Sequence, residues 1–188
     1  MLRSIAFGAL SLSLVAQVPE QVRVEGRVLD PGGKPIAGAV VALVPVASEN
    51  RDLGVIPLGR TSATGAFALS VPPVRIGLTL TAPGYLPHFQ NLELKAGADL
   101  KPLEIRLTKG GCRIQGTVVT AKGLKPEGTR LVFAKFSQDE GDQFFAEVQQ
   151  GRFDVTLAPG AYLVQAQAKG QTGGQRLEVV GDQQGLKI

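Results

Sequence analysis

The first strongly patterned segment of the chain, Val22–Leu29, alternates between apolar and polar positions. Its even positions are small or apolar, and three of its odd positions are charged. This period of two is typical of a strand with one face on a core and the other in water. The turn-forming residues 30–35 come next, followed by Val40–Val44, an unbroken apolar run too short for a helix. We therefore expect a strand, a tight turn and a second, buried strand.

Short alternating segments separated by turn signals continue to about residue 109. Thr64-Gly65 marks a hairpin bend, Phe67 begins an inward alternation, and Pro83-Gly84 turns the chain again. Residues 47–59 are polar and irregular, which is typical of a surface loop. Further strands are expected at residues 67–71, 76–80, 89–94 and 103–107. Seven strands within about 90 residues indicate a β-sandwich, and no long helical period occurs after residue 20, so the fold is predicted to be all-β.

The second half of the chain repeats the pattern of the first. Arg113–Val118 repeats Arg23–Val28 at an offset of 90 residues. Gly151-Arg152-Phe153 repeats Gly65-Ala66-Phe67 at an offset of 86, and Phe67 and Phe153 take matching inward positions. Such self-similarity indicates an internal duplication.

The repeats predict two tandem sandwiches, at residues 20–109 and 112–188. Lys109-Gly110-Gly111 is expected to be a short flexible join between them. The chain ends at Ile188, which leaves room for a last strand of three or four residues. Strands of the second copy are expected at residues 131–136, 144–148, 153–157, 162–168 and 176–180.

The first residues differ from this β pattern. Arg3 precedes the apolar run Ile5–Val15, which ends at Ala16. A basic start, a short apolar stretch and a small residue resemble a secretory signal peptide. The run is too short to span a bilayer, which takes about 20 apolar residues. We expect residues 1–16 to be a signal peptide and the mature chain to start near Gln17, without a transmembrane segment. The protein is then expected to be exported to the periplasm or the cell exterior.

Four spaced elements carry a family resemblance: Gly26-Arg27-Val28, residues 33–41, Thr64-Gly65-Ala66-Phe67 and Ala82-Pro83-Gly84-Tyr85. In this order they resemble the carboxypeptidase regulatory-like domain. The resemblance implies a seven-stranded transthyretin-like sandwich that serves as a non-catalytic accessory module in exported bacterial proteins. The second copy is more divergent, because Lys169-Gly170-Gln171 lacks the aromatic residue that follows Gly84.

Composition narrows the classes of partner. The chain is 44% hydrophobic and 19% charged, which permits a packed core. Its formal net charge of +4 is spread along the chain, with no run of three basic residues, so no nucleic-acid partner is expected. The lone Cys112 cannot form an internal disulfide, and at the start of a strand it is expected to be a small buried apolar residue.

The sequence offers little for catalysis. The transthyretin-like fold includes hydroxyisourate hydrolases, which need several histidines and a particular C-terminal tail, whereas His88 is the only histidine here. No metalloprotease, serine-hydrolase or phosphate-loop motif occurs. We expect no enzymatic activity, no cofactor and no metal site, and a hydrolase of this fold is kept as an alternative.

Two places are candidate binding sites. Tyr85, His88 and Phe89 follow a turn and offer an aromatic platform for a peptide or a sugar ring, or Tyr85 and Phe89 simply cover the end of the sandwich. The acidic cluster Asp139-Glu140-Gly141-Asp142 is either a cation site or a solvated loop.

Together these features predict an accessory or adhesion-like binding protein that acts through a protein or cell-envelope partner. A carbohydrate-binding module that uses surface aromatic residues is the alternative, although the chain contains no tryptophan.

Overall fold

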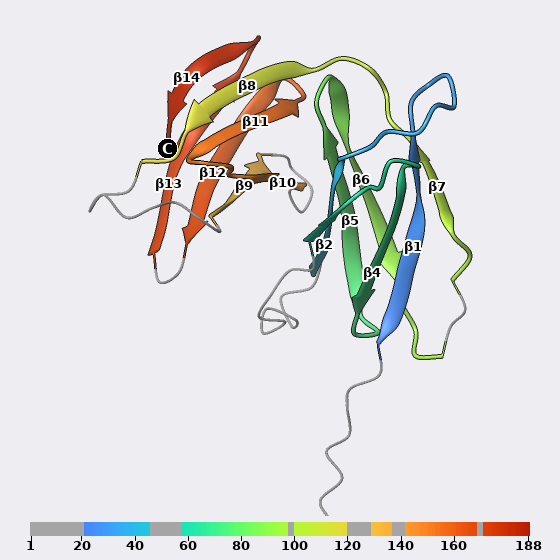
Figure 1. Ribbon diagram of the computed structural model, residues 1–188. Helices are drawn as coiled ribbons and strands as arrows, with labels where there is room; N and C mark the ends of the chain where they lie inside the picture. The colour runs from blue at the N-terminus through green and yellow to red at the C-terminus, as the bar shows by residue number, and fades with distance from the viewer. Residues whose placement is uncertain (1–20, 46–57, 98–99, 120–128, 137–141, 169–170) are drawn as a thin grey trace, which may run out of the picture.

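The prediction of an all-β chain is confirmed by the computed structural model (Figure 1). The described residues form fourteen strands and no helix, and so contain no helix that is long and apolar enough to cross a bilayer. The structure describes residues 21–45, 58–97, 100–119, 129–136, 142–168 and 171–188.

The first seven strands form two sheets that face each other. β1 lies at the centre of a three-stranded sheet of order β4-β1-β7, and the other sheet has the order β3-β2-β5-β6. Side chains from the inner faces of both sheets form one core. The strands are β1 (Val22–Leu29), β2 (Val40–Pro45), β3 (Leu58–Arg60), β4 (Ala66–Val71), β5 (Arg75–Ala82), β6 (Tyr85–Glu93) and β7 (Leu103–Arg106).

The last seven strands repeat this arrangement. Their sheets have the orders β11-β8-β14 and β10-β9-β12-β13, so each strand takes the place of the strand seven numbers before it. A second core fills the space between these sheets. The strands are β8 (Cys112–Thr117), β9 (Arg130–Lys135), β10 (Gln143–Glu147), β11 (Arg152–Leu157), β12 (Gly160–Ala168), β13 (Gln171–Val179) and β14 (Gln183–Lys187).

Phenylalanine and glycine are packed in the same way in both cores. Phe67 and Phe153 are 6% and 4% exposed, as the alternation of β4 and β11 predicts. Each ring lies against a glycine of the neighbouring strand, because a Cβ on Gly26 would lie 3.0 Å from Phe67 Cε1 and one on Gly116 would lie 2.7 Å from Phe153 Cζ. Cys112 is buried in the second core as a free thiol, as expected.

Several strand boundaries differ from the prediction. β3 includes Leu58 and Gly59, which fall within the expected surface loop, and the turn at Thr64-Gly65 leads from β3 to β4 in the other sheet instead of closing a hairpin. β6 begins at Tyr85 rather than at residue 89, because Gly84 adopts a φ of 79° and closes a tight hairpin directly after β5. β13 begins at residue 171 and forms a long hairpin with β12. β14 has five residues and pairs in parallel with β8, so the last strand is longer than expected.

The outer faces of the two four-stranded sheets pack against each other. In β2, alternate residues point into the first core, while Val40, Ala42 and Val44 point outward. On the facing sheet, Val132 of β9 and Phe145 of β10 also point away from their own core. These five side chains form a buried apolar cluster, the junction cluster, with Leu58 at its side. Figure 1 shows the two sandwiches side by side as a result.

The join between the sandwiches is attached to the first one. The Gly110 amide donates to the Gly84 carbonyl at 3.1 Å, and the Leu86 amide donates to the Thr108 carbonyl at 2.8 Å. A Cβ on Gly111 would lie 2.7 Å from Thr156 Cγ2 of the second sandwich. The expectation of a flexible join is therefore wrong, because backbone hydrogen bonds and close packing hold these residues in place.

Candidate functional site

A cleft of about 830 Å³ lies along the junction and is lined by residues of both sandwiches. The first sandwich contributes Arg60 and Pro83. The second contributes the outer face of the sheet β11-β8-β14 and the residues next to it. These residues are Gln115, Gly116, Thr117, Glu147, Gln149, Gln150, Arg152, Phe153, Asp154, Gln184 and Gly185.

Thr61 fixes the end of β3, and thereby Arg60, at the edge of the cleft. Its side chain is buried, and Oγ1 accepts a hydrogen bond from the Ala39 amide at 2.9 Å and donates one to the Ile36 carbonyl at 2.7 Å. The Thr61 backbone bonds in both directions with the same turn, through Gly38 and Ala39. A hydroxyl that satisfies two buried backbone groups holds this turn against β3.

Arg60 connects the two sandwiches. Its Nη1 donates to the Gly38 carbonyl at 2.9 Å, and its Nε donates to Glu147 Oε2 at 2.8 Å, with a second bond from Nη2 to the same oxygen. The side chains of Arg60 and Glu147 are 40% and 31% exposed. An ion pair this exposed contributes about 0–1 kcal/mol. The apolar junction cluster therefore stabilises the contact, while the ion pair shapes the cleft.

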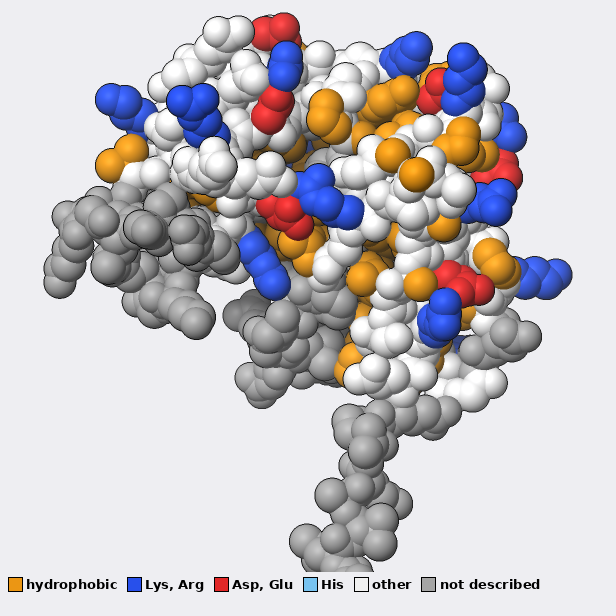
Figure 2. All heavy atoms as spheres, in the orientation of Figure 1, with side chains coloured by type: hydrophobic (Ala, Val, Ile, Leu, Met, Phe, Trp, Pro, Cys, Tyr) orange, Lys and Arg blue, Asp and Glu red, His pale blue; other side chains and the backbone are white. Residues whose placement is uncertain are grey.

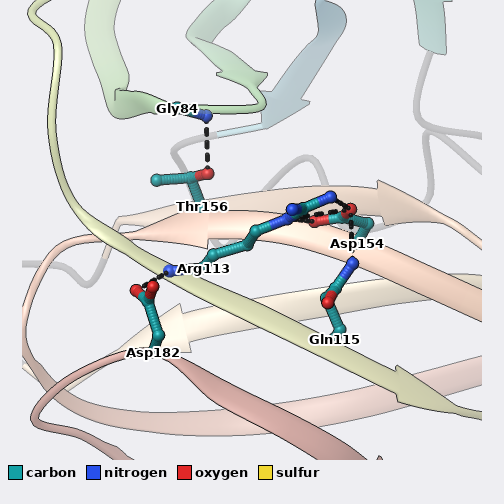
Figure 3. Close-up of polar contacts among 6 residues, drawn as sticks. All are labelled: Gly84, Arg113, Gln115, Asp154, Thr156 and Asp182. Carbon is teal, nitrogen blue, oxygen red and sulfur yellow. Dashed lines mark hydrogen bonds and ion pairs between the residues drawn. The ribbon is translucent and has the colours of Figure 1, made fainter.

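A second charged group lies on the outer face of β8 and β11 (Figure 3). Arg113 donates three hydrogen bonds of 2.5–3.1 Å to the Asp154 carboxylate, and Gln115 Nε2 donates one at 2.9 Å. The Arg113 backbone amide donates to Asp182 at 2.8 Å. The hydrogen bond from Arg113, together with that from Gln115, holds the pKa of the Asp154 carboxyl below its usual value.

Acidification is expected to remove the stabilisation that Asp154 provides. Because the pKa of this carboxyl is lower in the folded than in the unfolded chain, its contribution is complete above the unfolded value of about 3.9 and is lost as the pH falls through the folded value. Urea unfolding of the native chain and of Asp154→Asn checks this. The difference in unfolding free energy should be largest at neutral pH and should shrink in strong acid. A difference that stays constant with pH would contradict the role of this carboxylate.

Two neutral hydrogen bonds complete the junction. The Gly84 amide donates to Thr156 Oγ1 at 2.9 Å, as Figure 3 shows, and Thr81 Oγ1 donates to the Phe145 carbonyl at 2.9 Å. Thr156 and Thr81 are 2% and 5% exposed, so both hydroxyls are removed from water. The junction therefore combines apolar packing with satisfied polar groups, as a stable intramolecular contact requires.

Both carboxylates that line the cleft take part in ion pairs. Glu147 and Asp154 are each held by an arginine, and the lowered pKa of Asp154 keeps it ionised at neutral pH. Figure 2 shows basic side chains next to acidic ones at several points on one face of the molecule. In the described part of the chain, no group of three His, Cys, Asp or Glu side chains is placed to hold a metal ion.

The structure does not bring the predicted site residues together. Tyr85 packs against the first core, whereas Phe89 of the same strand packs against the second. His88 lies opposite Leu80 of the first core, and its Nε2 is buried without a hydrogen-bond partner in the described residues. A shared aromatic platform on β6 therefore has no support in the structure, because these side chains point to opposite faces of the strand. Of the acidic cluster, residues 139–141 lie outside the described residues.

The cleft residues had only a partial signal in the sequence. The alternation around Phe153 places Asp154 on an outer face, and the offset of 90 residues places Gln115 on the strand beside it. Nothing local relates Arg60 to Glu147, which are 87 residues apart. Their pairing depends on how the two sandwiches pack, which strand periodicity does not specify.

Residues 23–108 match the family model of the carboxypeptidase regulatory-like domain. The first sandwich belongs to this family, as its four motifs indicated, and membership of the second sandwich stays a prediction. The search of curated proteins finds no match.

Among solved structures, three similar chains have low sequence identity. The Bacillus anthracis TIE protein is 16% identical, with 89% of this chain and 33% of that chain covered and a TM-score of 0.40. A Streptococcal ancillary pilin is 15% identical, with 90% and 61% covered and a TM-score of 0.39. Hydroxyquinol 1,2-dioxygenase from Pseudomonas putida DLL-E4 is 17% identical, with 50% and 58% covered and a TM-score of 0.39. The chain spans a third of the first protein and under two thirds of the other two, and no property of theirs is transferred to it.

Proposed function

We propose that this chain is a non-catalytic, exported binding protein that holds a protein or another component of the cell envelope. The observation that carries the proposal is the junction, where the outer faces of two sheets share one buried apolar cluster. Because the junction fixes one sandwich against the other, Arg60 of the first and Asp154 of the second line the same cleft. The two sandwiches thus provide one composite binding surface.

The lining of the cleft supports a role in holding a ligand. Its carboxylates are paired with arginines, and its other polar groups are mainly glutamine amides, which both donate and accept hydrogen bonds. Fixed donors and acceptors of this kind orient a bound chain without reacting with it. Export is proposed from the leader-like pattern of Arg3, Ile5–Val15 and Ala16, which lies outside the described residues.

The two alternatives have no supporting site in the described residues. Sugar binding through surface rings would need a group of exposed aromatic side chains, but Tyr85 and Phe89 pack against the cores, and the exposed ring of Phe136 has Arg176 over its face. A hydrolase would need a nucleophile beside a base, but the only histidine, His88, does not line the cleft.

Retention of the purified mature chain on envelope fractions of the producing cells tests the proposal. We expect saturable retention that unlabelled chain competes away. Val132→Glu, which places a charge in the junction, should reduce retention, and Val180→Glu at an exposed position should not. Retention without saturation would contradict the binding role, and turnover of a substrate that Asp154→Asn abolishes would contradict the non-catalytic role.

A further inference from the structure

Each sandwich has a hollow on the outer face of its three-stranded sheet. The first hollow, of about 530 Å³, lies over β1, β4 and β7, and the second hollow is the cleft over β8, β11 and β14. Gly26 and Phe67 line the first hollow, and the equivalent residues of the second sandwich, Gly116 and Phe153, line the second. Arg60 lines both, so the two hollows meet at this side chain.

One arginine occupies the same cross-strand position in each hollow. In the first sandwich, Arg27 of β1 lies opposite Ala66 of β4. In the second, Thr117 of β8 lies opposite Arg152 of β11. The repeat offsets relate Arg27 to Thr117 and Ala66 to Arg152. The equivalent cross-strand pair therefore contains one arginine in each sandwich, although opposite strands supply it.

These two arginines carry the uncompensated charge of the hollows. Both are exposed, and neither makes a side-chain hydrogen bond or ion pair within the described residues. Four arginines and four carboxylates line the two hollows. Every one of these carboxylates has an arginine partner, and two of the partners, Arg106 and Arg113, lie beside the hollows rather than in their lining. Arg27 and Arg152 are therefore the lining arginines that have no carboxylate partner within the described residues. The pairs are Arg23–Glu25, Arg106–Glu104, Arg60–Glu147 and Arg113–Asp154.

Asp182 lies beside the second hollow without lining it, and the Arg113 backbone amide already holds its carboxylate at 2.8 Å. Within the described residues, Asp182 makes no hydrogen bond or ion pair with Arg152.

The remaining lining favours a peptide over a glycan. The second hollow presents the amides of Gln115, Gln149, Gln150 and Gln184, which can bond to the peptide groups of an extended chain. The rings that line the hollows, Phe67 and Phe153, are buried, so they offer no flat surface for a sugar.

We propose that the two hollows bind an extended acidic segment of a partner protein, with one of its carboxylates on Arg27 and another on Arg152. Guanidinium and carboxylate groups form paired, charge-assisted hydrogen bonds, which suits arginine for this task. An extended segment with acidic residues at every second position presents its carboxylates on one face. Such a segment can pass from one hollow to the other, because the two hollows meet at Arg60. The proposal rests on the binding role proposed above and specifies its partner.

Binding of a labelled Glu-Ser repeat peptide, measured by fluorescence anisotropy, tests the proposal. A Gln-Ser repeat peptide of the same length serves as the uncharged control. We expect Arg27→Gln and Arg152→Gln each to weaken binding of the Glu-Ser peptide by about tenfold, since each removes one set of charged hydrogen bonds. Arg75→Gln, at an exposed position that lines neither hollow, should bind as the native chain does. Unchanged circular dichroism and melting temperature would show that the variants fold.

Three results would overturn the inference: equal affinity for the Gln-Ser peptide, an equal loss in Arg75→Gln, or tighter binding of polygalacturonate with the same dependence on Arg27 and Arg152. The last result would assign the hollows to an anionic glycan. If the peptide fails to bind while envelope retention persists, this inference falls and the binding role stands. If retention is absent, the binding role itself falls.

Discussion

Replacing Phe153 by alanine is expected to remove a large part of the stability of the second sandwich. The ring is 4% exposed, lies 6.2 Å from the ring of Phe133 and fills the space beside Gly116. Truncation of a buried phenylalanine costs about 3–5 kcal/mol, much of the roughly 5–15 kcal/mol that stabilises a typical domain. Phe67→Ala should have the same effect on the first sandwich, where the ring lies in the equivalent place.

Thermal unfolding followed by circular dichroism checks this prediction. Phe136→Ala is the matched control, because its ring is 56% exposed and contacts Arg176 only as a cation–π pair at 5.6 Å. The control should lose no more than about 1 kcal/mol. A melting temperature that falls equally in Phe136→Ala and Phe153→Ala would contradict the assignment of Phe153 to the core.

The interior of each sandwich could be predicted from the sequence because strand periodicity determines it. The alternation around Phe67 and Phe153 assigns both rings to the inner face, and the repeat offsets relate Gly26 to Gly116. Glycine occurs at these two positions because any Cβ would collide with a phenylalanine ring and a carbonyl oxygen. These are local and nearest-strand constraints, which a sequence pattern records.

The junction could be predicted only in part. The unbroken apolar run Val40–Val44 indicates a strand that is buried on both faces, and Phe144-Phe145-Ala146 has the same property. Such runs show that the outer face of the sheet is covered, but they do not identify the covering segment. Here the strands that contain the two runs pack against each other, and this packing brings Arg60 and Glu147 together as an ion pair. The contribution of the first sandwich to the cleft could not be predicted for this reason, since Arg60 meets the residues of the second sandwich only when the two sandwiches pack together.

Replacing Val132 by glutamate is expected to separate the two sandwiches. Val132 is 4% exposed and lies in the junction cluster opposite the outer face of β2. Burying an unpaired carboxylate there would cost several kcal/mol. If the junction opens, the carboxylate returns to water, and only the packing of the junction cluster and a few polar contacts are lost. Val132 belongs to neither core, so each sandwich should stay folded in the variant.

The measurement is small-angle X-ray scattering combined with calorimetry. Val132→Glu should increase the radius of gyration and split thermal unfolding into two transitions, because the sandwiches no longer stabilise each other. The same substitution at Val180, which is 82% exposed, adds an equal charge and should change neither quantity. If Val132→Glu keeps the native radius of gyration and a single transition, the sandwiches do not depend on this cluster for their association. Since Arg60 and Asp154 line one cleft only while the junction is closed, the same variant should lose the composite surface that both proposals require.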